Sequence, residues 1–266
     1  MKISLTARIL LWSVMIFGFA FIYVPLVLVV INSFNKNTSF AWPPTGFTTS
    51  WWSKAAVNEG VRDAIARSAV VALSATLIAL ILGSLAAAAI ARYKFFGREV
   101  ISLLFVLPIA LPGIVTGIAL NNVFTNFLGQ LTIFTIIVGH ATFCIVVVFN
   151  NVAARYRRLG ASLEEASMDL GANRLTTYRL ITFPLLRSAL LAGGLLAFAL
   201  SFDEIIVTTF TAGAGQNTLP IWIFQNLFRP NQAPIVNVVA AALIIVSIIP
   251  IYLSQRLTQD KSGNAN

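Results

Sequence analysis

The chain has 266 residues, of which 58% are hydrophobic and only 10% are charged. Soluble domains carry charge on about a quarter of their residues, so this composition excludes an ordinary soluble protein and favours the membrane class. The net charge of +9 could suggest nucleic-acid binding. The distribution of the basic residues argues against that reading, and we expect no nucleic-acid partner.

Six apolar stretches are long enough to cross a hydrocarbon core of about 30 Å, which takes roughly 20 helical residues. They cover residues 9–31, 64–91, 100–122, 132–154, 188–211 and 235–254. We therefore expect an all-α integral membrane protein in contact with lipid. Its six transmembrane helices would form a single domain over residues 1–266.

The basic residues are divided unequally between the two sides of this topology. With the N-terminus inside, thirteen fall in inner segments and four or five in outer ones. The inner ones are Lys2, Arg8, Arg92, Lys94, Arg98, Arg155, Arg157, Arg158, Arg174, Arg179, Arg187, Arg256 and Lys261, and the outer ones are Lys36, Lys54, Arg62 and Arg229, with Arg67 just inside the second span. Such an excess over short loops marks the cytoplasmic side, so both termini are expected there.

The third span contains two prolines and two glycines, at Pro108, Pro112, Gly113 and Gly117. These residues should bend or interrupt the helix. Broken backbone at membrane depth persists only where protein or water covers it. A kink for packing and a role in lining a pathway are equally compatible with this pattern.

The two longer outer loops differ in composition. Residues 32–61 are rich in Phe and Trp, which suits an aromatic belt at the headgroups, a docking surface for an extracytoplasmic partner, or both. Residues 212–234 contain Gly and Pro and are expected to hold a short amphipathic helix around residues 219–227.

The longest inner loop, residues 155–187, has the pattern of two short helices. Ser162 and Glu165 have the spacing of a capping box, and Gly171 lies where a left-handed helix stop is wanted. Asn173 can cap a second short helix that Pro184 closes. The small residues on the first helix favour close approach of another protein over an amphipathic pair lying on the bilayer.

The same segment resembles the cytoplasmic signature of the permeases of ABC importers, E-A-A-x3-G-x9-I-x-L-P. Here it reads Glu165-Ala166-Ser167, then Gly171, then residues 181–184 ending in Pro184. Ser167 replaces the second alanine and Phe183 the leucine. The resemblance implies a type I importer fold in the bacterial cytoplasmic membrane. It also implies a coupling helix that docks on an ATPase subunit through Glu165, Ala166, Ser167, Gly171 and Pro184.

The resemblance extends over nearly the whole chain. The run 199–204, followed by 209–211 and 218–220, is similar to spermidine and putrescine permeases, in particular the second of two non-identical permeases. Such a system implies a second permease subunit, two ATP-hydrolysing subunits and an extracytoplasmic solute-binding protein. The implied substrate is a small cationic polyamine, with another amine, an amino-acid-like or an opine-like solute as the alternative.

Asp203 and Glu204 lie 15 and 16 residues into the fifth predicted span, in its outer half. An ionised carboxylate at the centre of a span costs about 2.5–3.5 kcal/mol and less toward the interface, so the pair needs water, a cation or a partner. One interpretation is that the pair lines the pathway and attracts a cationic substrate. The alternatives are an ion pair with an arginine of the partner permease, or caps on a broken helix.

Two other functional classes fit the sequence less well. An ion-coupled secondary transporter could use Asp203 and Glu204, but no inverted repeat is detectable. An intramembrane enzyme lacks its motifs, and without G-x-x-x-x-G-K-[ST] the chain cannot hydrolyse ATP itself. We expect no catalytic site, cofactor or metal. The lone His140 is expected to make interhelical hydrogen bonds.

Overall fold

The computed structural model describes residues 4–38, 42–229 and 231–246. Regular structure in these residues is helical, apart from an isolated bridge between Asn35 and Phe47. The chain divides into two compact units, Met1–Arg62 with Ile223–Asn266, and Asp63–Trp222.

The first unit contains the long helix α1 (Leu5–Asn32), the short helix α2 (Ser50–Val57) and an apolar helix over Ala233–Val246. The hydroxyl of Ser4 caps α1, and none of the residues of α1 is buried. Between α1 and α2, the indole of Trp51 donates a hydrogen bond of 3.0 Å to the carbonyl of Asn35. The apolar side chains of α1 are thus left for contact with lipid or another part of a membrane assembly.

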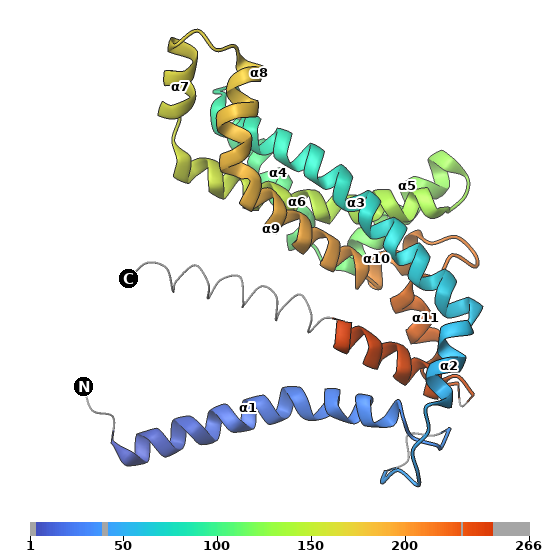
Figure 1. Cartoon of the computed structure of the whole chain (residues 1–266). Coiled ribbons are helices and arrows are strands. Elements are labelled where there is room, and N and C mark those ends of the chain that lie inside the picture. The colour runs from blue at the N-terminus through green and yellow to red at the C-terminus, as the bar shows by residue number, and fades with distance from the viewer. Residues whose placement is uncertain (1–3, 39–41, 230, 247–266) are drawn as a thin grey trace. The chain divides into compact units, whose positions relative to one another are not determined.

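The second unit carries the remaining helices and the packed core. They are α3 (Glu59–Arg92), α4 (Arg98–Ala110), α5 (Gly113–Leu128), α6 (Ile133–Leu159), α7 (Ser162–Asp169), α8 (Arg174–Thr177), the π-helical turn η1 (Tyr178–Thr182), α9 (Phe183–Phe202), α10 (Ile206–Thr211) and α11 (Leu219–Asn226). Figure 1 shows α7 and α8 at one end of this unit and α5 and α10 toward the other.

Small side chains bring the helices of this core close together. Helix α6 packs most extensively on α9, and it also contacts α4, α5 and α10. Buried alanines on α3 meet small and β-branched residues of α6, including Cys144 and Val148. Such residues let helix backbones approach closely where lipid supplies no hydrophobic driving force between helices.

Four helical runs of the described residues are long and apolar enough to cross a membrane: Leu5–Asn32, Glu59–Arg92, Ile133–Leu159 and Arg174–Phe202. They correspond to the first, second, fourth and fifth predicted spans. The third and sixth are represented by shorter apolar helices, and the sixth prediction, 235–254, extends outside the described residues. The all-helical class is confirmed, and the count of six spans stays a prediction.

The prediction that the third span is interrupted is confirmed. Leu111 leaves the helix in an extended conformation (φ −82°, ψ 141°), and Pro112 then caps α5. The residue before a proline is sterically driven out of the helical region, which explains the position of the break. The fifth predicted span, 188–211, is also broken, at residues 203–205 between α9 and α10.

The backbones of α3 and α6 approach each other closely at Gly83, so the stability of the protein should depend on the size of the side chain at this position. A Cβ atom at Gly83 would lie 2.9 Å from the carbonyl oxygen of Ile145 and 3.1 Å from the amide nitrogen of Phe149. Backbone atoms cannot move aside as a flexible side chain would, so Gly83→Ala should destabilise the protein by about 1–3 kcal/mol. Resistance to trypsin and retention of the monodisperse peak after heating in detergent would report the loss.

The matched control is Gly18→Ala, because a Cβ atom at Gly18 meets nothing within 4 Å. Equal heat resistance of the Gly83 and Gly18 variants would contradict the proposed close packing of α3 on α6.

Candidate functional site

The 155–187 segment is built around α7, an eight-residue helix between two glycines. Gly160 and Gly171 have positive φ angles of 64° and 89°, a backbone region that favours glycine. The amide of Gly171 donates to the carbonyl of Met168 at 2.9 Å and closes the helix. The left-handed stop predicted at Gly171 is therefore confirmed.

The predicted capping box is wrong. Helix α7 begins one residue earlier than the box requires, with Ala161 at the N-cap and Ser162 as the first helical residue, and no side chain caps it. The amides of Glu164 and Glu165 instead donate to the carbonyl of Ala161 at 3.0 Å each. Both carboxylates lie in the first turn, where the helix dipole favours negative charge.

The predicted cap at Asn173 is confirmed, because its side chain accepts a hydrogen bond of 2.8 Å from the amide of Thr176. Pro184 does not end the short helix that Asn173 caps, so the prediction for Pro184 is wrong. The chain continues through η1 into α9, with the amide of Phe183 bonded to the carbonyl of Tyr178 in π-helical spacing. Pro184 then falls in the first turn of α9, where a missing amide hydrogen is tolerated.

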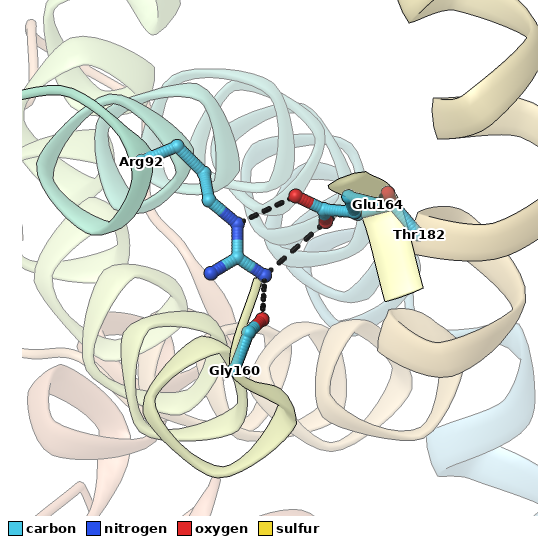
Figure 2. A network of polar contacts seen from close by, with 4 residues as sticks. All are labelled: Arg92, Gly160, Glu164 and Thr182. Carbon is cyan, nitrogen blue, oxygen red and sulfur yellow. Dashed lines mark hydrogen bonds and ion pairs between the residues drawn. The ribbon is translucent and has the colours of Figure 1, made fainter. Parts of the chain in front are cut away.

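An ion pair joins α7 to the end of α3 (Figure 2). Arg92 Nε lies 2.7 Å from one carboxylate oxygen of Glu164, and its Nη2 donates to the other oxygen at 3.2 Å and to the carbonyl of Gly160. The hydroxyl of Thr182 donates to the same carboxylate at 2.8 Å, and the guanidinium lies 4.9 Å from the centre of the Tyr156 ring. The carboxylate therefore holds the ends of two long helices at once.

This cluster was not predicted from the sequence. Arg92 stands out there only as one of the inner basic residues, and Glu164 lies 72 positions further along the chain. Two sequence features together could have indicated the cluster. One is an arginine at the end of a span, and the other is an acid shortly after the glycine that ends a later span.

The exposed surface of α7 combines apolar and polar side chains. Leu163 and Ala166 are exposed, and Leu170, directly after the helix, is 90% exposed. Ser167, which was predicted to share this face, turns partly inward, and its hydroxyl lies 3.1 Å from that of Thr177. Glu165 is exposed on the first turn.

The acidic pair lies at the break between α9 and α10. Asp203 ends α9 and is exposed, whereas Glu204 is half-buried and accepts a hydrogen bond of 2.8 Å from the amide of Val207. Neither acid forms an ion pair within the part of the chain that the structure describes. One of the predicted alternatives, a cap on a broken helix, is thus what Glu204 provides.

His140 connects both sides of that break to α6. The ring is fully buried; Nδ1 lies 2.7 Å from the hydroxyl of Ser201 on α9, and Nε2 lies 2.8 Å from that of Thr208 on α10. The Thr208 hydroxyl donates to the carbonyl of Glu204 at 2.9 Å, so it accepts from the imidazole. The predicted interhelical hydrogen bonding of His140 is confirmed. Among the described residues no cluster of three His, Cys, Asp or Glu side chains could hold a metal ion.

The far end of α10 is held by side chains from two other helices. Asn121 on α5 donates 2.6 Å to the carbonyl of Phe210, and Thr135 on α6 donates 2.7 Å to the carbonyl of Thr211. A Cβ atom at Gly117 would lie only 2.6 Å from the ring of Phe210. The short helices α5 and α10, which follow the two breaks, therefore pack directly on each other.

Long apolar helices, two helix breaks within the predicted spans and a polar helical segment between two of the spans are the features of a multi-pass membrane protein. The chain belongs to the family described as binding-protein-dependent transport system inner membrane component, whose model matches residues 79–262.

Two curated relatives and one solved structure extend the comparison. The spermidine/putrescine transport system permease protein PotC of Escherichia coli K12 is 32% identical, over 92% of this chain and 93% of its own. The putrescine transport system permease protein PotI of the same strain is also 32% identical, over 93% and 92%. A crystal structure of a bacterial ABC transporter involved in alginate import matches with a TM-score of 0.73 at 19% identity, covering 98% of this chain and 99% of that one. This chain thus has the importer permease fold.

The hydrogen bonds of His140 predict a measurable coupling across the α9–α10 break. His140→Phe keeps the ring but removes both interhelical bonds, each worth about 0.6 kcal/mol on average in membranes and at most about 1.7 kcal/mol. The midpoint of thermal unfolding in detergent should therefore fall. In a double-mutant cycle with Thr208→Val, the two losses should be less than additive.

The control is Thr142→Val on the same helix, because the Thr142 hydroxyl bonds only to the carbonyl of Gly139 in its own helix. A drop for His140→Phe no larger than for Thr142→Val, together with strict additivity in the cycle, would contradict the role given to His140.

Proposed function

We propose that this chain is the permease subunit of an ATP-driven importer that carries a putrescine- or spermidine-type polyamine across the bacterial cytoplasmic membrane. The observation that carries the proposal is the 32% identity to PotC and PotI over more than nine-tenths of the chain. The chain acts as a single permease domain over residues 1–266. It pairs with a second, non-identical permease, and the solute passes between the two.

Energy and substrate come from other subunits. Two ATP-hydrolysing subunits bind on the cytoplasmic side, and a solute-binding protein delivers the polyamine from outside. Both termini are cytoplasmic, as the thirteen inner basic residues favour. In this orientation the 155–187 segment faces the ATPase subunits, and the break at residues 203–205 lies in the outer half of the membrane.

We assign α7 as the coupling helix that enters a groove on an ATPase subunit. Its exposed Leu163, Ala166 and Leu170 offer an apolar surface of the size that a short docking helix needs. Glu165 lies beside this surface, and Gly171 ends the helix with a turn that other residues adopt poorly. Ser167 and Pro184 do not face the partner: the Ser167 hydroxyl contacts Thr177 of α8, and Pro184 lies in the first turn of α9.

The small side chain of Ala166 supplies the first functional test. Ala166→Trp adds a large ring at the exposed centre of α7, so it should prevent close docking and abolish polyamine uptake in reconstituted vesicles. Folding and membrane insertion should be unchanged, because Ala166 is not packed against the rest of the chain.

Thr176→Trp is the matched control, since it adds the same ring at another exposed position of the 155–187 segment, on α8. Normal uptake by Ala166→Trp would exclude α7 as the docking helix.

The acid pair gives the pathway its preference for cations. Asp203 is exposed at the helix break and free to meet a substrate ammonium group, whereas Glu204 adds charge from the position where it caps α10. The attraction between opposite charges grows as the dielectric constant falls, so a carboxylate acts more strongly on an amine where water is scarce.

Neutralising Asp203 tests this role. Asp203→Asn keeps the size of the side chain and removes its charge, so uptake of labelled putrescine and spermidine should fall about tenfold, more than a screened surface charge contributes. Asp203→Glu should retain most uptake, because it keeps the charge. Glu204→Gln removes the charge of Glu204 but keeps its cap, because the amide oxygen of glutamine can still accept from the amide of Val207. Loading of the binding protein should be normal throughout.

Co-purification of the subunits distinguishes a pathway role from a structural ion pair with the second permease. A pathway role leaves the complex assembled and inactive, whereas a lost ion pair makes it dissociate. Parent rates of amine uptake in both Asp203→Asn and Glu204→Gln would eliminate the cationic pathway.

A further inference from the structure

We propose that Arg92 is a positioning residue for energy coupling: its ion pair with Glu164 makes α3 move with α7. This inference rests on the proposed docking of α7 on an ATPase subunit. Under it, a displacement of α7 reaches α3 through Arg92 and α9 through Thr182, because both side chains bind the Glu164 carboxylate.

Polar contacts hold α7 in place, because α7 has no apolar core of its own. None of its residues is buried, and glycines with positive φ angles flank it on both sides. Within the described residues, its polar side-chain links are the Glu164 contacts and the hydroxyl contact from Ser167 to Thr177. The Arg92–Glu164 pair is the strongest of these links, since both partners are charged and a hydrogen bond from Nη2 accompanies the 2.7 Å ion pair.

Arg92 is held in a geometry that a flexible cation could not reproduce. Its guanidinium binds both Glu164 oxygens and the Gly160 carbonyl while facing the Tyr156 ring. The side chains of the ion pair are only 20% and 18% exposed, so solvent and salt screen it less than a surface pair. Lysine would keep the charge but lose the planar fork.

Helix α3 extends this connection to the opposite end of the second unit. Arg67, 25 residues before Arg92 and so about 37 Å along the helix, donates to the carbonyls of Gly215 and Asn217 at 3.1 and 3.0 Å. The neighbouring Ser68 hydroxyl accepts from the amide of Leu219 at 2.8 Å. A displacement at Arg92 therefore has a continuous helical and hydrogen-bonded route to the 212–218 loop.

A structural role and a coupling role for Arg92 make different predictions. If the pair only keeps the 155–187 segment folded, its loss should weaken assembly or lower ATP hydrolysis and transport in proportion. If the pair transmits movement, the ATPase subunits should still hydrolyse ATP when Arg92 is replaced, but less solute should be imported for each ATP.

The experiment uses the complete complex in proteoliposomes with loaded binding protein, and it measures putrescine imported and ATP hydrolysed in the same vesicles. Arg92→Gln should lower the ratio of putrescine to ATP about tenfold, within the range of typical coupling between sites. Arg92→Lys should give an intermediate ratio. The control is Lys94→Gln, which removes a positive charge from an exposed neighbour that forms no ion pair within the described residues, and it should match the parent.

The double variant Arg92→Glu with Glu164→Arg reverses both charges and so tests the ion pair even if the single changes disturb assembly. Each single reversal should uncouple the complex, and the double variant should recover a large part of the parent ratio. Thr182→Val, which removes only the second donor to Glu164, should assemble and lose less than Arg92→Gln.

An unchanged putrescine-to-ATP ratio in Arg92→Gln, or failure of the double variant to exceed the single reversals, would overturn the role of Arg92. Those results are distinct from failure of the proposed function, which would appear as no putrescine uptake by the parent complex or as normal uptake by Ala166→Trp.

Discussion

Within hydrocarbon, each backbone amide and carbonyl must find its hydrogen-bond partner inside the protein, and this requirement governs how the two breaks are built. The break at residues 203–205 exposes the first amides of α10, and the Glu204 carboxylate takes one of them. The last carbonyls of α10 receive the Asn121 amide and the Thr135 hydroxyl. Most polar side chains near this break therefore have structural partners. The carboxylate of Asp203 is different, because it is exposed, and that contrast gives the two adjacent acids separate roles.

His140 makes the same break a fixed feature of the fold. A six-residue helix such as α10 has little stability of its own, since helices this short are marginal without tertiary contacts. The imidazole binds hydroxyls on both sides of the break, and α5 packs along α10 through the close contact of Gly117 with Phe210. The break is consequently held in one geometry, which is what a carboxylate needs if it is to present its charge at a constant depth.

The long, uninterrupted helices could be predicted from the sequence, since a run of apolar residues is itself the signal for a span. Helices α3 and α6 match the predicted 64–91 and 132–154 within about five residues at each end, and Pro112 correctly marked the first break. The second break could be offered only as one alternative for the acidic pair, because it contains neither glycine nor proline. The contacts of His140 that fix it come from tertiary packing. The errors at Ser162 and Pro184 have a related cause: a local motif is compatible with more than one helix start, and a π-helical turn can absorb a proline.

Arginines have two separate effects in this chain, and sequence patterns reveal only one of them. Counted as charges, the basic residues indicate which loops are cytoplasmic, and for this purpose every arginine is equivalent. Considered as hydrogen-bond donors, the arginines are not equivalent: Arg92 and Arg67 each bind a segment far away in the chain, near the two ends of α3. A helix with firm attachments near both ends transmits a displacement better than one embedded in lipid alone, since its movement cannot be taken up by local slippage. Arg92 thus counts toward the inner excess of charge and also, together with Arg67, gives α3 the contacts that a transmitting element requires.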